Sequence, residues 1–211
     1  MTMPNHFDFT LVVSGIDPMD DTFPNAVYEG GGSDATISSR SGVVHVSFSR
    51  KRPSLIEAIF SAIHEVEKAN PKAQVVRVDD ANLLNQAQMG VLVHKTRQMV
   101  NQYIAGKKGP GGFPAPACEF PNGKRLWDWS TASLWFFKAG ILGMDRCKEA
   151  ELIRAINNQL ERRVLNTQNP KLLGEISKRL LPRAFTSSFS KPTLRSHPLK
   201  AGSKARSRLV G

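Results

Sequence analysis

Hydrophobic residues alternate with polar ones near the start of the chain. Phe7, Phe9, Leu11 and Val13 occupy every second position there, and this pattern predicts a strand with one buried face. A short helix is expected to follow over residues 22–29.

A hairpin is expected next. Residues 35–39 and 43–50 have strand character, and they flank the turn residues Arg40-Ser41-Gly42. One face of the second strand is apolar and consists of Val44, Val46 and Phe48.

A long amphipathic helix follows the hairpin. Ser54 and Glu57 have the spacing of a capping box at its start, and it is predicted to end near Asn70. Residues 73–78 are then expected to form a fourth strand. The helix carries an apolar stripe at helical spacing, predicted to be buried, made of Ile56, Ile59, Phe60, Ile63 and Val66.

Residues 7–80 therefore follow the order βαββαβ, which predicts two helices over one face of an antiparallel sheet, the ferredoxin-like arrangement. RNA-recognition modules share this order but stack bases on exposed strand aromatics. The third strand offers only Phe48, and residues 1–81 carry seven Lys and Arg against eleven Asp and Glu. RNA binding by this half is therefore disfavoured.

Between residues 82 and 129 the pattern changes to two short helices joined by a tight turn. Asn85 is a good N-cap, and Gln88 completes a weaker form of the capping box. Leu84 and Met89 have the spacing of a hydrophobic staple.

The second short helix has one apolar face and one amide-rich face. Thr96 is its predicted N-cap, Arg97 its first residue and Gly106 its left-handed stop. At ~100° per residue the faces separate into an inner set, Val100, Tyr103 and Ile104, and an outer set, Gln98, Asn101, Gln102 and Ala105.

The outer face carries the chemistry that reads DNA bases. Amides and arginine pair bidentately with adenine and guanine edges in the major groove, and Arg97 flanks these amides. Lys107 and Lys108 follow where such a helix would meet phosphate. A solvated helix face is the alternative reading, and on the helix alone it is equally favoured.

A β-hairpin is predicted directly after this helix. The glycines and prolines of residues 109–116 exclude a helix there. Residues 117–120 and 125–129 then flank Pro121-Asn122-Gly123-Lys124, a strong turn signal. The predicted tip of this wing carries two cations, Lys124 and Arg125.

The sequence RQMVNQYIAGKKGPGGFPAP, followed by RLWDW, resembles bacterial helix-turn-helix regulators of the MerR and AlpA groups. In those proteins a recognition helix runs into G-x-R-G-P-G-x-F-P-x-P and then a wing strand with W-x-W. The resemblance covers about 50 residues and implies DNA binding through a winged helix-turn-helix. One residue departs from the pattern, because His94 occupies the turn position that usually holds glycine.

Charge becomes positive along the chain. Residues 82–129 hold six Lys and Arg against two acids, residues 130–181 hold nine against five, and residues 182–211 hold seven and no acid. This gradient indicates that contacts with a polyanion lie after residue 81.

No catalytic or metal site is predicted. The five histidines are scattered, and the two cysteines lack metal-ligand spacing, so reduced cysteines in the cytoplasm are expected. The pairs Asp20-Asp21 and Asp79-Asp80 could hold Mg²⁺, but adjacent acids at element ends are usually caps or linkers. No signal peptide or membrane span is apparent.

Helices are expected again after the wing. Ser130 is the predicted N-cap of one helix, and a second runs from Asp145 to about Leu165. A shorter helix follows Pro170, and the Ser-, Pro-, Lys- and Arg-rich segment after residue 181 is expected to be disordered. The apolar positions of the last two helices are Ile153, Ile156, Leu160, Val164, Leu172, Leu173, Ile176 and Leu180.

We therefore expect an α+β protein with four parts. Residues 1–80 form a ferredoxin-like domain and residues 81–144 a winged helix-turn-helix domain. Residues 145–181 form C-terminal helices, and residues 182–211 form a disordered basic tail.

The expected function is a cytoplasmic, bacterial, sequence-specific regulator of transcription that binds double-stranded DNA, acts as a repressor and is not an enzyme. No cofactor or membrane partner is expected; a homodimer and a protein partner of the N-terminal domain are hypotheses. The alternatives are an antitoxin-like protein that autoregulates its operon and a prophage excisionase-type protein that bends DNA. The residues expected to bind DNA are Thr96, Arg97, Gln98, Asn101, Gln102, Lys107, Lys108, Lys124 and Arg125.

Overall fold

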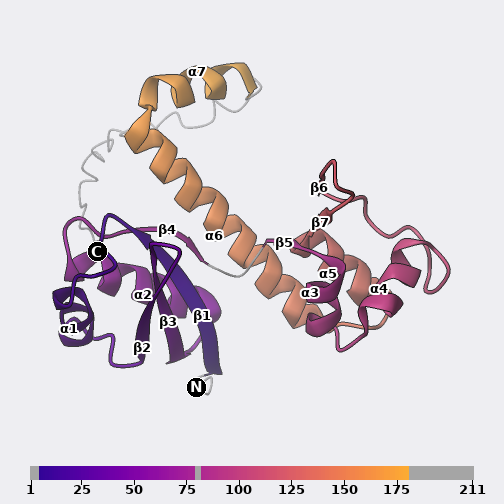
Figure 1. Ribbon diagram of the computed structural model, residues 1–211, viewed down its shortest axis with the longest axis horizontal. Coiled ribbons are helices and arrows are strands. Elements are labelled where there is room, and N and C mark those ends of the chain that lie inside the picture. The colour runs from indigo at the N-terminus through magenta and orange to yellow at the C-terminus, as the bar shows by residue number, and fades with distance from the viewer. Residues whose placement is uncertain (1–4, 79–81, 181–211) are drawn as a thin grey trace, which may run out of the picture. The chain divides into compact units, whose positions relative to one another are not determined.

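A computed structural model describes residues 5–78 and 82–180 of the 211-residue chain (Figure 1). The described residues have a mixed α+β fold with seven helices and two antiparallel sheets. The chain divides into two compact units, residues 1–168 and residues 169–211. The predicted Asp79-Asp80 pair and the predicted basic tail lie outside the described residues.

The first six elements form an antiparallel sheet with two helices. They are β1 (Asn5–Ser14), α1 (Thr22–Glu29), β2 (Ala35–Arg40), β3 (Val43–Arg52), α2 (Leu55–Ala69) and β4 (Gln74–Val78). The strand order is β2-β3-β1-β4, so β1 and β3 are central and β2 and β4 are the edges. The order of elements predicted from the pattern is confirmed, and α1 has the predicted bounds.

The β2–β3 turn needs two left-handed residues. Ser41 has φ +51° and Gly42 has φ +76°, the conformation of a two-residue turn that matches strand twist. The predicted apolar face of β3 is buried, and the Phe48 ring stacks on Phe9 with centroids 5.5 Å apart. The aromatic that an RNA-recognition surface would expose therefore lies in the core.

The predicted buried stripe of α2 is wrong in two places. Ile56 is 43% exposed and Phe60 is 54% exposed, whereas Ala58 and Ala62 are fully buried. Alanine carries little hydrophobic area, so it was absent from the predicted stripe, but its small side chain lets a helix approach its neighbours closely. Ser54 caps α2 as predicted, because its side chain accepts a hydrogen bond from the Glu57 backbone N–H.

A buried arginine ties β3 to α2 and to the turn before β2. Arg50 is 1% exposed. Its guanidinium donates to Asp34 at 2.7 and 2.8 Å, to Ser61 at 2.8 Å and to Glu65 at 2.6 Å. It also lies 4.6 Å from the centre of the Phe48 ring. The sequence pattern had not singled out this arginine.

The network shifts the pKa of Arg50 and the pKa of Asp34. Burial lowers the pKa of Arg50, but the hydrogen bonds to Asp34 and Glu65 outweigh it, and the pKa is raised overall. The hydrogen bond from Arg50 lowers the pKa of Asp34.

Side chains cover the outer edge of β4. Val75 donates its N–H to Glu67 at 3.0 Å, and its carbonyl accepts from Arg163 at 2.7 Å. The Asn157 side-chain amide bonds both backbone groups of Val78. Its oxygen accepts from the Val78 N–H at 2.7 Å, and its nitrogen donates to the Val78 carbonyl at 3.0 Å. Backbone groups that an edge strand would leave open are thus paired.

The next six elements form a second core. They are β5 (Leu83–Leu84), α3 (Gln86–Leu92), α4 (Arg97–Ile104), β6 (Cys118–Glu119), β7 (Arg125–Asp128) and α5 (Trp129–Lys138). The strands form a small sheet in the order β5-β7-β6. Met89, Val100, Trp127 and Phe136 are buried at its centre.

The predicted start of α5 is corrected by two residues. Ser130 is not the N-cap; the Asp128 carboxylate accepts the Thr131 N–H at 3.1 Å and caps the helix instead. Ser130 donates its hydroxyl to the same carboxylate. Trp129, predicted to end the wing strand, is therefore the first residue of α5.

The long helix α6 (Met144–Gln168) packs against both cores. Ile153, Ile156 and Leu160 join the core of the four-stranded sheet, as their spacing predicted. Near the start of α6, Cys147 is buried and its thiol donates to the Ser133 carbonyl of α5 at 3.2 Å. Both cysteines are free, and the predicted domain boundaries at residues 80 and 144 stay predictions.

The last described helix is α7 (Pro170–Leu180), and none of its residues is buried. Leu172, Ile176 and Leu180 follow one another at four-residue spacing and are exposed. In the described ranges, no helix has the length and apolar character that a bilayer span requires.

Candidate nucleic-acid interface

The start of α3 has the capping geometry that its sequence predicts. The Asn85 side chain accepts hydrogen bonds from the Ala87 and Gln88 N–H groups at 2.9 and 3.0 Å. The Gln88 side chain accepts the Asn85 N–H at 2.9 Å, which completes the capping box. Leu84 and Met89 are both buried, in agreement with the predicted staple.

A close contact between backbones sets the turn from α3 to α4. The Lys95 N–H donates to the Gly90 carbonyl at 2.8 Å, and a Cβ on Gly90 would lie 2.6 Å from the Lys95 oxygen. Only glycine leaves room for this approach. The sequence pattern did not point to Gly90, because a glycine inside a helix usually counts only as a weak position.

The next turn residue, His94, is left-handed as its place in the sequence indicates. Its φ is +52°, a region in which a non-glycine side chain costs free energy. His94 is exposed. Its side chain therefore brings strain to the turn without a compensating burial.

We expect His94→Gly to stabilise the protein by about 0.5–1 kcal/mol, because glycine adopts the left-handed region without the Cβ penalty. Chemical denaturation followed by circular dichroism measures this change. The exposed neighbour Lys95 is the control: Lys95→Gly, at a residue without positive φ, is expected to destabilise. Equal destabilisation by both changes would contradict the strain at His94.

Helix α4 separates its two faces as predicted. Thr96 caps it by accepting the Met99 N–H at 3.1 Å. On the inner face Val100 is fully buried, and the Tyr103 ring lies 5.5 Å from the Trp135 ring. The outer residues that remain exposed are Arg97, Gln98, Asn101 and Ala105.

Gln102 does not share this exposure. It is half-buried, and its side-chain oxygen is shielded from solvent without a hydrogen-bond partner among the described residues. Its position, 100° further round the helix from Asn101, brings it to the boundary of the two faces. The backbone carbonyl of Gln102 accepts from the Lys107 and Lys108 N–H groups, which ends the helix.

The glycine- and proline-rich loop after α4 is held by two tryptophans. The indole N–H of Trp135 donates to the Gly111 carbonyl at 2.8 Å, and that of Trp127 donates to the Pro114 carbonyl at 3.0 Å. Phe113 lies 4.8 Å from the Trp135 ring. These contacts connect the loop to the core beneath α4 and lead the chain into the wing.

The wing has the turn that its sequence predicts. The Phe120 N–H donates to the Lys124 carbonyl and the Gly123 N–H donates to the Phe120 carbonyl, at 2.8 and 2.9 Å. The Asn122 side chain accepts the Lys124 N–H at 3.0 Å. Gly123 has φ +76°, so the Asn-Gly pair supplies both the side-chain bond and the left-handed residue that the turn requires.

A polar groove of about 470 Å³ lies between the start of α3, the outer face of α4 and the wing turn. Three cations line it, Arg97 from α4 and Lys124 and Arg125 from the wing. Asn101 also lines it, and its side-chain oxygen accepts from Gln86 at 3.3 Å. None of the described lining residues is acidic, although Glu119 lies 3.9 Å from the Arg125 Nε beside the groove.

No protein-family model, curated protein or solved structure matches the chain.

The groove unites four of the nine predicted DNA-binding residues, Arg97, Asn101, Lys124 and Arg125. The other five do not line it. The exposed ones are Thr96 just before α4, Gln98 on it, and Lys107 and Lys108 after it, and Gln102 is partly buried. The groove adds Gln86 from the start of α3, which was not among the predicted residues.

The predicted Asp20-Asp21 pair does not line this groove. Asp20 accepts the N–H and the hydroxyl of Thr22 at the start of α1, whereas Asp21, the N-cap residue, makes no side-chain cap hydrogen bond. Within residues 5–78 and 82–180, no group of three His, Cys, Asp or Glu side chains is arranged to hold a metal ion.

Proposed function

We propose that the protein is a sequence-specific regulator of transcription, a repressor that binds double-stranded DNA. The observation that supports this best is the groove in which Arg97 and Asn101 lie beside the wing cations Lys124 and Arg125. Fixed positive charge at a groove attracts phosphate, and exposed amide and guanidinium groups can pair with base edges.

The same proposal includes the finer fold assignment. The strand order β2-β3-β1-β4 with two intervening helices supports a ferredoxin-like first half. Helices α3 and α4 with the β6–β7 hairpin support a winged helix-turn-helix of the MerR and AlpA type. A regulator of this kind works in the cytoplasm, without a catalytic site or cofactor.

In this proposal α4 enters the major groove and the wing contacts the adjacent backbone. The eight residues of α4 span about 12 Å, and the major groove of B-DNA admits a helix. Arg97 and Asn101 lie one helical turn apart, so both can reach base edges from one side of the helix. Lys107 and Lys108, which leave the helix after Gly106, are placed in the proposal at phosphates.

Arg97→Ala and Asn101→Ala are expected to relax base preference by about 1–3 kcal/mol each, because each removes a bidentate contact. Lys107→Ala and Lys108→Ala are expected to weaken binding to all duplexes alike and to reduce the salt dependence. Fluorescence anisotropy with a duplex selected from genomic DNA by the wild-type protein, and with its shuffled sequence, measures both effects.

Two exposed residues of α6 serve as matched controls for these variants. Arg162→Ala and Asn158→Ala remove the same side chains outside the groove and are expected to leave base preference unchanged. Equal losses on selected and shuffled duplexes for Arg97→Ala and Asn101→Ala would mean that α4 does not read bases.

We further propose a homodimer, because one helix-turn-helix covers a single half-site. The exposed residues Leu172, Ile176 and Leu180 on α7 support it, since a stripe of exposed apolar side chains on a helix favours self-association. Light scattering at micromolar concentration is expected to give twice the 23.3 kDa of one chain. A mass of one chain at that concentration would remove the dimer.

A second candidate is an antitoxin-like protein that binds a partner and autoregulates its operon. The exposed Ile56 and Phe60 of α2 favour it, because neighbouring apolar side chains on a helix surface suit a protein interface. Co-expression with the product of the adjacent gene tests it. Purification of that product in a one-to-one complex, lost on Phe60→Lys, is the result this candidate requires.

A further inference from the structure

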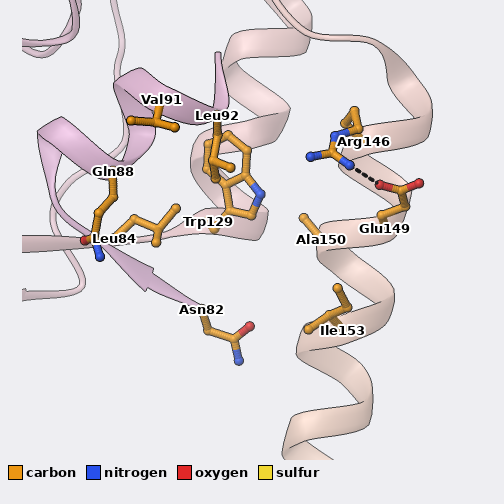
Figure 2. A pocket seen from close by; sticks show the side chains of 10 residues that line it. All are labelled: Asn82, Leu84, Gln88, Val91, Leu92, Trp129, Arg146, Glu149, Ala150 and Ile153. Carbon is orange, nitrogen blue, oxygen red and sulfur yellow. Dashed lines mark hydrogen bonds and ion pairs between the residues drawn. The ribbon is translucent and has the colours of Figure 1, made fainter. Parts of the chain in front are cut away.

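A second cavity lies away from the polar groove and shares no lining residue with it. It has a volume of about 330 Å³, and it is lined by Asn82 and by residues of β5, α3, the first turn of α5 and α6. Figure 2 shows Ala150 and Ile153 of α6 facing Trp129 and Leu84 across it. Its volume is within the range of small-molecule sites, which starts near 300 Å³.

The deep walls of this pocket are apolar. Leu84, Ala150 and Ile153 are each at most 7% exposed, and Leu92 completes this surface. Val91 lines the pocket but is 74% exposed, so it marks the opening to solvent. An apolar ligand would displace water from surfaces that the protein already keeps close together.

The indole N–H of Trp129 points into the pocket and has no hydrogen-bond partner among the described residues. The indole N–H groups of Trp127 and Trp135 both donate to backbone carbonyls. The N–H of Trp129 donates to none of the described residues, and Figure 2 shows this nitrogen on the side of the ring that faces α6. Trp129 is half-buried, so its N–H is a donor available for an acceptor in the pocket.

The charges at the rim cancel. Arg146 donates to Glu149 at 2.9 Å, and both side chains line the pocket (Figure 2). A carboxylate ligand that approached Arg146 would be repelled by Glu149. An ammonium ligand that approached Glu149 would be repelled by Arg146. A neutral ligand avoids both repulsions.

We propose that this pocket binds a small, neutral and mostly apolar molecule whose carbonyl oxygen or ring nitrogen accepts the Trp129 N–H. The apolar walls hold the body of the ligand, and the indole N–H orients it, which is the usual division of roles in a small-molecule site. The site does not depend on the proposed DNA binding, because none of its residues lines the polar groove.

The test uses a neutral naphthalene ketone dye, 6-propionyl-2-dimethylaminonaphthalene, with the full-length protein. The dye has a flat apolar body, a carbonyl acceptor and an emission that shifts to the blue in apolar surroundings. We expect one saturable site per chain with blue-shifted emission. The anionic dye 1-anilinonaphthalene-8-sulfonate is expected to bind at least tenfold more weakly.

Three variants test whether the dye binds in this pocket. Ala150→Trp fills the space and is expected to abolish binding, while Ala155→Trp, at an exposed position of the same helix, is expected to leave it unchanged. Trp129→Phe keeps an aromatic ring but removes the donor, and is expected to weaken binding about 3- to 10-fold, the effect of one net hydrogen bond. Circular dichroism confirms that each variant is folded.

If Ala150→Trp does not fold, a change at the exposed residue Val91 tests the proposal instead. Val91→Asp places a charge at the opening and is expected to weaken dye binding at least fivefold without affecting the fold. Unchanged affinity in both Trp129→Phe and Val91→Asp, absence of saturable binding to the wild type, or equal affinity for the anionic dye would each overturn the proposal.

Discussion

Arg50→Ala will lower the free energy of unfolding by about 3–5 kcal/mol, which is the typical loss when one partner of a buried ion pair is removed. The guanidinium satisfies Asp34, Ser61 and Glu65 at once, so its removal leaves two carboxylates without their cation. It also removes the long side chain that lies against Phe48. Urea denaturation followed by circular dichroism measures the loss.

Arg50→Met separates charge from packing. Methionine restores much of the buried volume but leaves the carboxylates unpaired, so we expect it to recover only a minor part of the loss. A stability close to that of the wild type would show that packing, and not the ionic network, is what Arg50 contributes. Arg162→Ala, at an exposed arginine, is the control and is expected to change stability by less than about 0.5 kcal/mol.

The Arg50 network also makes the stability of the folded protein depend on pH in acid. The pKa of Asp34 is lowered in the folded state by the hydrogen bond from Arg50, so its contribution is fully present above the ordinary pKa of aspartate. It is lost as the pH falls through the lowered value. The difference in stability between wild type and Asp34→Asn is therefore expected to be constant near neutral pH and to shrink below about pH 4.

Gly90→Ala will destabilise the protein by about 1–3 kcal/mol, the usual cost of forcing an extra methyl group into a close contact. The new Cβ would lie 2.6 Å from the Lys95 carbonyl oxygen, so α3 and α4 must move apart. Under the proposed function the same displacement turns Arg97 away from Lys124 and weakens DNA binding. Thermal unfolding and fluorescence anisotropy measure the two effects.

The control for this change is Gly174→Ala in α7, where an added Cβ meets nothing within 4 Å. In an open helix alanine is favoured over glycine by about 1 kcal/mol, so this variant is expected to gain helicity. An unchanged or raised stability of Gly90→Ala would contradict the tight α3–α4 approach.

Local signals predicted most of the fold. The N-caps Ser54, Asn85 and Thr96 each rest on a side-chain oxygen placed next to an amphipathic run, and all three are confirmed. The bounds of α1 and the left-handed His94 were also correct. These features depend on residues within one turn of each other, which a sequence displays directly.

The predictions are wrong where packing between distant segments decides which residues are buried or where a helix begins. Ile56 and Phe60 are exposed on α2 although both are large apolar residues, because the face that meets the core includes the small residues Ala58 and Ala62. Asp128 caps α5 in place of Ser130 because the wing strand ends one residue earlier than its aromatic pattern suggested. Helical spacing identifies a face but does not say which face meets the sheet.

The candidate site was predicted only in part for the same reason. The sequence identified Arg97, Asn101, Lys124 and Arg125 one by one, but their meeting in one groove depends on how α4 packs beside the wing. Gln86 and the pocket beside Trp129 were not predicted at all. Both involve side chains brought together from separate helices, and no short-range pattern encodes that.

The side chains along β4 restrict how the four-stranded sheet can grow. Val75 and Val78 are already bonded to Glu67, Arg163 and Asn157, so the backbone groups of these two residues are not available to an incoming polypeptide. Addition of another strand, in an amyloid-like assembly or by exchange between copies, is therefore favoured at the other edge strand, β2. Strand β2 is rich in hydroxyl side chains and ends in Arg40, so it offers little apolar surface to an added strand.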